Sequence, residues 1–539
     1  MIAAVLSASN PATAENDLPP VGHSRFDELV GKASVPYPFS RLVDKVNAQM
    51  QPDPGGLPPL KTTLIPLGRS LQRDAGAPDF FRYPRVVAAA DGDNQPGIAP
   101  LKDRLFLGFH EKGEVVEVIS YNDAAGRFEF QVVRDYAPGK TPKIFYARRA
   151  LCLACHQNAA PIFARPLWDE TPANPDIAAR LKSARRNFYK VKLSGTDIAY
   201  FIDAAADRAN LFPVWQTLWQ QGCCDGTTGA RCRRDAFAAA LEYVRFGKLP
   251  RADSLPALAA RWKTLWPKGL PIPNPDLPNR DPLAPLQDPA SDPLLLRPPL
   301  ETWHAPDVTA FVVGLAGMLD RAATRALPAD LAPALDRLSA DGRFASRPFT
   351  LALLDDVRQT LGQPRARAPG KLPAARVEPA SGSVSNPLVA PFHMHCAACH
   401  DTTLSHPPNF LHGDPAQVEA SLDQCAERIY VRLARAHAPA GSPGVAAMPP
   451  AAALQARGIA PARWVASNEL AALMRAIEAR LPVGDARSLL RRPYASLRPC
   501  PGAYTAPGAT AGRSQSARHP SLLQAARAEP RRAASPGTP

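Results

Sequence analysis

Two short motifs built from cysteine and histidine carry the clearest chemistry in this sequence. Both have the pattern Cys-x-x-Cys-His, at residues 152–156 and 396–400. In this pattern the two thiols can add to the vinyl groups of a haem as thioethers, and the histidine then binds the iron. The sequence therefore predicts two covalently attached haems. The attachment residues are Cys152, Cys155, Cys396 and Cys399, and the predicted iron ligands are His156 and His400.

Three other interpretations of these cysteines stay open. Four cysteines can hold a structural zinc ion, but zinc pairs usually lie much closer in sequence and need no histidine after each pair. A thioredoxin-like redox pair would need a strand-to-helix setting and no histidine. Ordinary disulfides are the simplest interpretation. We favour haem because a histidine directly follows both cysteine pairs.

The second motif is followed by Pro407-Pro408-Asn409-Phe410-Leu411 and later by Met448-Pro449-Pro450. With these features the region from about 391 to 481 resembles the small class I-like cytochrome c domain. In that family a loop methionine, often followed by proline, binds the iron opposite the histidine. The resemblance implies that Met448 is the sixth ligand of the second haem. It also implies two helices with one apolar side each, carrying Val418, Leu422, Ile429 and Leu433, then Trp464, Leu470, Leu473 and Ile477.

The sixth ligand of the first haem is not indicated by any one pattern. The tentative ligands are His110, which ends a predicted strand, and His304, which follows a proline-rich stretch. Met318, His393 and His395 are further candidates, and the iron could also have an open sixth site. After the motif, Phe163 and Trp168 could pack on the ring, and Arg165 could meet a propionate. These additional residues are typical of core packing and protein surfaces as well.

Five cysteines lie outside the two motifs. In an oxidising compartment we expect Cys232 to pair with Cys223 or Cys224, which closes a short loop. We expect a second disulfide between Cys425 and Cys500. One thiol is then left over.

The patterning predicts a mainly α-helical fold with a β-rich N-terminal segment and an all-α cytochrome c-like domain at the C-terminal end. Alternation over 114–121 and 127–134 around a Gly-containing turn predicts a β-hairpin. Helices are expected over 196–220, 235–246, 306–327, 329–339 and 349–361. The predicted organisation is a haem-binding region over 15–362, a flexible linker over 363–386, the cytochrome c domain over 387–500 and a disordered tail over 501–539. Within the haem-binding region we expect a β-rich part over 60–147, a helical part over 148–265, a Pro-rich part over 268–299 and a second helical part over 300–362.

Composition and charge narrow the class of protein. The chain has 539 residues, 61 prolines, 45% hydrophobic residues and a formal net charge of +14. Part of the excess charge lies in the predicted tail, in Arg513, Arg518, Arg527, Arg531 and Arg532. No nucleic-acid-binding motif is present, so we expect no nucleic-acid partner.

The N-terminus predicts export. Ala12-Thr13-Ala14 has the small-x-small pattern of a signal cleavage site, so residues 1–14 are interpreted as a truncated signal peptide. No other stretch is long and apolar enough to cross a membrane. Export would place the protein in the periplasm, where disulfides persist.

Three functions are compatible with two attached haems. The first is electron transfer in the periplasm to a partner redox protein. The second is a haem oxidoreductase with one open iron, peroxidase- or oxygenase-like, because the chain loosely resembles the dihaem cytochrome c peroxidases and their relatives. The third is a sensory or binding module. We favour the first.

Overall fold

The computed structural model places most of the chain between residues 21 and 500. The described residues are 21–68, 73–95, 97–164, 170–193, 195, 197–250, 255–277, 294, 297–304, 308–365, 372, 374, 376–377, 389–402, 407–439, 445–482 and 486–500. Residues 1–503 belong to one compact unit and residues 504–539 to another. The predicted signal peptide and tail therefore lie outside the described residues.

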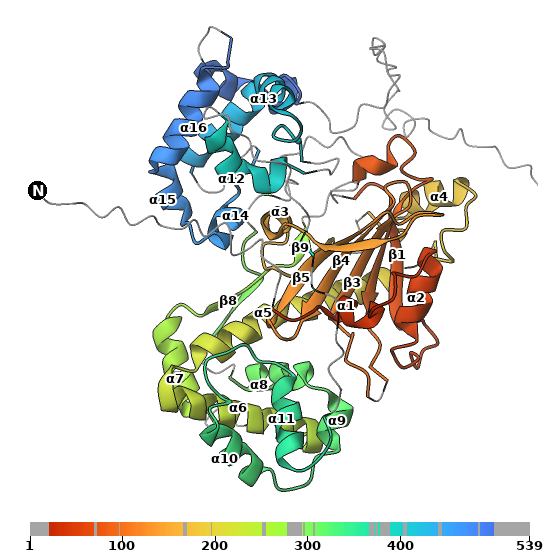
Figure 1. Ribbon diagram of the computed structural model, residues 1–539, viewed down its shortest axis with the longest axis vertical. Coiled ribbons are helices and arrows are strands. Elements are labelled where there is room, and N and C mark those ends of the chain that lie inside the picture. Colours follow the sequence, from red (N-terminus) through yellow and green to blue (C-terminus); the bar gives the residue numbers. More distant parts are fainter. Residues whose placement is uncertain are drawn as a thin grey trace, which may run out of the picture. The chain divides into compact units, whose positions relative to one another are not determined.

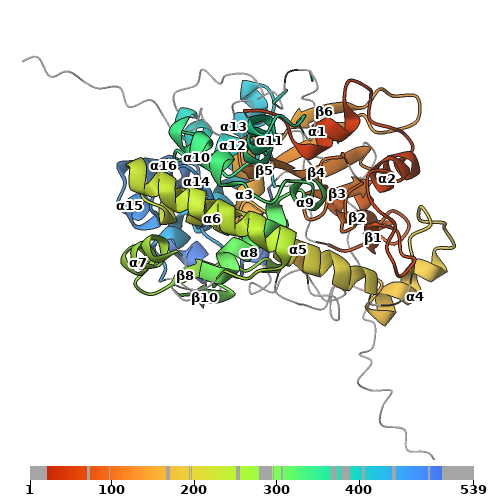
Figure 2. The ribbon, with the colours of Figure 1, turned by 90° about the horizontal axis from the view of Figure 1, so that it is seen from below.

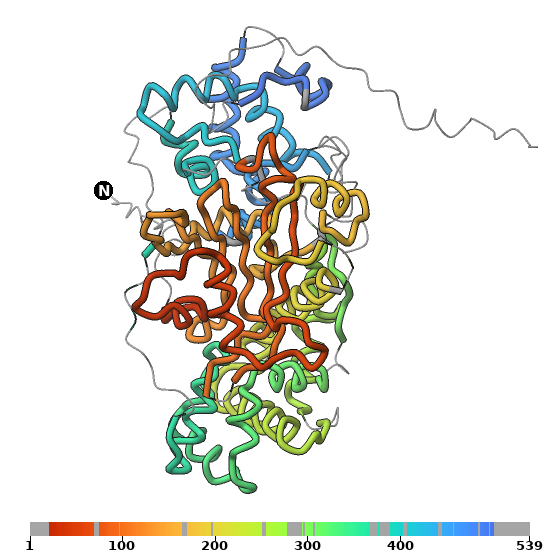
Figure 3. The backbone as a smooth tube through the Cα atoms, turned by 90° about the vertical axis from the view of Figure 1, so that its right-hand side faces the viewer, coloured from red at the N-terminus to blue at the C-terminus, as the bar shows by residue number. Residues whose placement is uncertain are grey.

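An antiparallel sheet of six strands dominates the N-terminal part (Figure 1). Its strands pair in chain order and lie side by side in Figure 3. They are β1 (Leu60–Ile65), β2 (Arg85–Ala90), β3 (Leu105–His110), β4 (Val115–Asn122), β5 (Arg127–Arg134) and β6 (Lys143–Tyr146). The predicted hairpin is confirmed as β4 and β5, because Asn122 pairs with Arg127 and Gly126 takes a positive φ of 61° in the turn.

Both faces of this sheet are covered. Leu105, Leu107 and Phe109 of β3 pack into a core with the helices α1 (Arg25–Val30) and α2 (Phe39–Asn47). Phe106, between them in sequence, packs into the opposite core. All six residues of β3 are buried, because successive side chains of a strand point to opposite faces.

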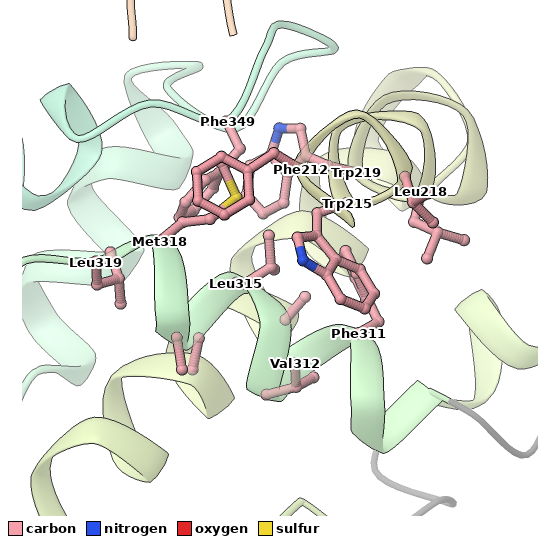
Figure 4. Close-up of a cluster of buried hydrophobic side chains, with 14 of the residues drawn as sticks. Phe212, Trp215, Leu218, Trp219, Phe311, Val312, Leu315, Met318, Leu319 and Phe349 are labelled. Atoms are coloured by element: carbon pink, nitrogen blue, oxygen red, sulfur yellow. The ribbon is translucent and has the colours of Figure 1, made fainter. Parts of the chain in front are cut away.

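The opposite face is covered by the long helix α5 (Asp197–Thr217), which runs across the sheet (Figure 2). It continues into a π-helical turn, Leu218–Gly222. Aromatic and aliphatic side chains from this segment meet those of α8 (Val308–Met318) and of the chain near Phe349 in one core (Figure 4). The remaining elements of this region are α3 (Arg149–Cys155), α4 (Pro175–Ser183), α6 (Gly226–Phe246), α7 (Pro256–Leu265), α8 (Val308–Met318), α9 (Arg321–Arg325), α10 (Ala332–Ala340) and α11 (Ala352–Thr360).

Two helix predictions differ from the structure. The segment predicted as one helix over 306–327 is broken into α8 and α9, because Asp320 accepts a hydrogen bond from the Ala323 amide and starts a new helix. The helix predicted from residue 235 begins at Gly226, since Cys232 and Arg233 are buried and hold the preceding turns in place. The Pro-rich crossing contains β8 (Leu270–Ile272), which pairs with β10 (Glu301–Trp303), and β9 (Asp276–Leu277), which pairs with β7 (Phe163–Ala164).

The described residues after 389 form helices with a hydrophobic core of their own. The helices are α12 (Ala390–His400), α13 (Pro415–Ala434), α14 (Ala451–Ala456), α15 (Pro461–Val465) and α16 (Asn468–Glu478). All eight residues of the two predicted apolar sides are buried. Asp414 and Gln417 form a capping box that sets the start of α13.

Part of the predicted linker belongs to the sheet. The Tyr146 amide donates to the Arg376 carbonyl at 2.7 Å, and Tyr146 pairs with Val377 as a parallel bridge. Most of the other residues of the linker lie outside the described ones. No helix among the described residues is long and apolar enough to cross a membrane.

Candidate haem sites

The first motif forms a short helix and a tight turn directly after the sheet. Cys152 and Cys155 lie on α3, and His156 ends this helix with its amide bonded to the Cys152 carbonyl. The turn is closed by the Ala159 amide, which donates to the His156 carbonyl at 2.7 Å. Ala159 has a positive φ of 54° there. This turn brings the Ala160 carbonyl to 2.9 Å from His156 Nδ1. Because a carbonyl only accepts, Nδ1 carries the proton and Nε2 keeps its lone pair.

The second motif repeats this arrangement on α12. His400 Nδ1 lies 2.7 Å from the Pro408 carbonyl, so the proton again sits on Nδ1. The ring stacks on Phe410 with 4.3 Å between centroids, and the Leu411 amide donates to the His400 carbonyl. A metal-binding histidine almost always donates its second ring N–H in this way, which fixes the tautomer and the ring. Both histidines therefore have the orientation that an iron ligand requires.

The four motif cysteines are not disulfide-bonded. Burial raises the pKa of Cys152 well above its usual value and that of Cys396 to about 12. Reactive thiols of the thioredoxin type have a lowered pKa instead. The motif cysteines also form no zinc-type cluster in the described part of the chain. The only group of three or more possible metal ligands there is acidic, at Asp203, Asp207 and Asp276.

Arg297, a partly buried residue beside the first motif, bears on whether haem fits this site. Arg297 donates from Nη2 to the Cys155 carbonyl at 3.1 Å and from Nε to the Asn274 carbonyl at 3.0 Å. Its Nη1 is buried without an acceptor in the structure. A buried donor without a partner is unfavourable by about 1–3 kcal/mol. An anionic group such as a haem propionate would satisfy this nitrogen, so the surroundings of the motif fit the cofactor.

The loop that contains Met448 is tied to α13. The Met448 amide donates to the Arg432 carbonyl at 3.0 Å, and Arg432 Nη1 donates to the Ala446 carbonyl at 2.8 Å. Helix α14 begins three residues after Met448. These bonds hold the loop through its backbone and the Arg432 side chain, so the position of the loop does not depend on the thioether group of Met448. The binding of Met448 to iron stays a prediction.

The ring of the tentative ligand His110 is bonded to the backbone, which disfavours its assignment as an iron ligand. It is 2% exposed at the end of β3. Its Nδ1 accepts from the Gly113 amide at 3.0 Å, and the ring also bonds the backbone of Tyr83. Burial lowers the pKa of His110 to about 4. With both ring nitrogens used by the backbone, this histidine has none left for iron.

The other residues named for the first haem lie in different surroundings. Met318 belongs to the hydrophobic core (Figure 4). His304 is exposed next to β8, against Gly269. His393 and His395 lie on α12, where His393 Nε2 and His395 Nδ1 are buried without hydrogen-bond partners. Phe163 is buried in the core on β7, whereas Arg165 and Trp168 lie outside the described residues.

The two motifs meet in space although they are far apart in sequence. Helix α3 lies against α12 and α14 (Figure 1). Arg148, the residue before α3, donates to the carbonyls of Ala397 and Asp401 at 3.0 and 2.8 Å. The pKa of Cys152 is raised by burial and, to a smaller degree, by Cys399 of the other motif. No pattern in the sequence signals this contact, because a single arginine before a motif has no distinctive spacing.

The remaining cysteines form two disulfides. The sequence left Cys223 and Cys224 as alternative partners of Cys232. The structure pairs Cys232 with Cys223, so the alternative with Cys224 is wrong. Cys223 is 1% exposed at the end of the π-helical turn, packed with Cys232 in the same core, whereas Cys224 is free and only partly buried. The second disulfide joins Cys425 of α13 to Cys500. Comparison with known proteins adds nothing to these assignments, since no family model, curated protein or solved structure matches the chain.

Proposed function

We propose that this protein is a dihaem c-type cytochrome that transfers electrons in the periplasm. The observation that carries the proposal is the shared geometry of the two Cys-x-x-Cys-His motifs. In each, the histidine Nδ1–H is held by a backbone carbonyl, at Ala160 or Pro408, and Nε2 keeps its lone pair. Unrelated cysteine pairs would have no reason to share this arrangement. The helices from residue 389 onward would be the cytochrome c-like domain.

The residues of the chain would hold each cofactor in three ways. The paired cysteines would bind it covalently, the histidine would be a ligand of its iron, and Met448 would be a further ligand of the second iron. When bound, the haem iron supplies one-electron redox chemistry. Thioether ligation raises the reduction potential, which suits a carrier.

The contact between α3 and α12 favours electron transfer over an isolated binding function. Arg148 keeps the two motif helices together, so both sites belong to one redox unit. The excess of basic residues, with a net charge of +14, suits an acidic redox partner. Two disulfides and covalent haem attachment both suit the oxidising periplasm.

The test is to produce the exported chain in a bacterium that attaches c-type haems. The purified protein is extracted with acid acetone, and its intact mass is measured by mass spectrometry. We expect the pigment to stay with the polypeptide and the mass to include two haems. Replacing both cysteines of one motif by alanine, at 152 and 155 or at 396 and 399, should remove one haem each. Cys224→Ala, a free cysteine outside the motifs, is the matched control and should keep both. A pigment that extracts, or a mass without haem, would disprove the proposal.

A further inference from the structure

Arg148 joins the backbone of one motif to that of the other. It immediately precedes α3, and it is 7% exposed. Its Nη1 donates to the carbonyl oxygens of Ala397, at 3.0 Å, and Asp401, at 2.8 Å. Ala397 lies between the two cysteines of the second motif, and Asp401 directly follows His400. The Arg148 guanidinium therefore binds the second motif, although Arg148 lies only four residues before Cys152 of the first motif.

This contact lies at the C-terminal end of α12, where helix carbonyls lack partners within the helix. The Asp401 amide bonds to the Ala397 carbonyl and ends the helix there. A cation at a helix C-terminus is favoured by the helix dipole. Here the guanidinium gives the Ala397 carbonyl a second donor and also bonds the Asp401 carbonyl just past the end of the helix. Arg148 thus stabilises the end of the helix that carries Cys396, Cys399 and His400.

The charge of Arg148 lies against the second motif, on the residue that precedes the helix of the first motif. Arginine stays protonated in proteins, and a buried charge is poorly screened by solvent. A nearby positive charge disfavours the more positive, oxidised iron. The Arg148 guanidinium is hydrogen-bonded to the second motif, and Arg148 itself is the residue before α3, so we expect its charge to raise the reduction potential at both sites.

Building on the proposed function, we infer that Arg148 is a positioning residue that couples the two haem sites. It fixes α3 against α12, and it sets the potentials of both haems together. Neither effect requires Arg148 to touch iron or porphyrin.

The neighbouring residue offers a matched control. Arg149 is 8% exposed, so it is about as buried as Arg148. It bonds within the N-terminal part instead, donating to the Phe128 carbonyl at 2.7 Å and lying 3.5 Å from the Glu129 carboxylate. Arg149 affects the electrostatics of Cys152 but has no contact with α12 among its hydrogen bonds and ion pairs in the described residues. Its removal should therefore change the first haem alone.

The experiment measures the two midpoint potentials of the full-length dihaem protein by redox titration, with EPR to separate the haems. Arg148→Gln should lower both potentials, and Arg149→Gln should lower only that of the first haem. Arg148→Lys keeps the charge and should restore the potentials of both haems. Hydrogen exchange at the C-terminal end of α12 should become faster in Arg148→Gln and only partly recover in Arg148→Lys, because an ammonium cannot reproduce the bonds of the guanidinium fork.

The outcomes separate this inference from the proposed function. If the chain carries no covalent haem, the proposed function fails. If both haems are present but Arg148→Gln shifts only one of the two potentials, Arg148 does not couple the sites. Unchanged exchange of α12 in Arg148→Gln would disprove the positional part. Both parts of the inference are supported if Arg148→Gln lowers both potentials and speeds hydrogen exchange of α12, and Arg148→Lys restores the potentials.

Discussion

The burial of His110 makes the free energy of opening the sheet depend on pH. Burial lowers the pKa of His110 from 6.5 to about 4, with Gly113 and Tyr83 bonded to its ring. The folded state therefore disfavours the protonated ring, while the unfolded chain binds the proton below pH 6.5. The stabilisation is complete above pH 6.5 and is lost as the pH falls toward 4. Each pKa unit corresponds to 1.36 kcal/mol, so the full loss is about 3 kcal/mol.

The perturbation is His110→Asn, which removes the titrating group but keeps a polar side chain. Hydrogen exchange of the β3 and β4 amides at pH 7 and pH 4.5, corrected for the intrinsic effect of pH, reports the opening free energy of the sheet. The native protein should lose about 2–3 kcal/mol more than the variant over this interval. The optical spectra of both haems should be the same in variant and native protein, since both ring nitrogens are used by the backbone. Equal losses in both proteins would refute the pKa argument, and a changed haem spectrum would show that His110 is a ligand after all.

Three more substitutions address the loop that contains Met448, the unpaired Nη1 of Arg297 and the disulfide of Cys223. Met448→Ala should remove the weak methionine-to-iron absorption band and lower the potential of the second haem only, whereas Met474→Ala, a methionine packed on the same core, should keep the band. Arg297→Gln should lower the potential of the first haem in a redox titration and leave the second unchanged; equal shifts at both haems would contradict its local role. Cys223→Ser opens a disulfide that spans nine residues. It should destabilise the protein by about 2–3 kcal/mol in urea unfolding, while Cys224→Ser should have little effect; the reverse order would show that the pairing is wrong.

Local patterns predicted the elements whose signals lie close together in sequence. The hairpin of β4 and β5 follows from alternation around a turn with a glycine at positive φ. The apolar sides of α13 and α16 follow from helical periodicity, because each of these helices packs one side on a single core. The two Cys-x-x-Cys-His motifs were also recognised from spacing alone, because their residues are neighbours in sequence, and their attachment of haem stays a prediction.

Features that depend on a single side-chain bond or on distant contacts were missed. Asp320 breaks a continuous apolar segment into α8 and α9 by one capping bond, which periodicity does not register. Cys223 and Cys224 are equivalent by loop length, and only burial selects the first. For the same reason the sequence did not predict the bonds of Arg148 and Arg297. Their partners lie far along the chain or on turns that local rules do not place.

The bridge between Tyr146 and Val377 has a consequence for how the two motif helices associate. Val377 is fixed at the edge of the sheet beside Tyr146, which lies three residues before the start of α3 at Arg149. The chain that leads to α12 therefore starts beside the surface that α12 contacts. A short tether of this kind gives its ends an effective concentration of about millimolar order. The contact between α3 and α12 can then persist with an intrinsic affinity far too weak to hold two separate molecules. Cleavage of the chain between Val377 and Val389 should therefore release the C-terminal fragment on dilution.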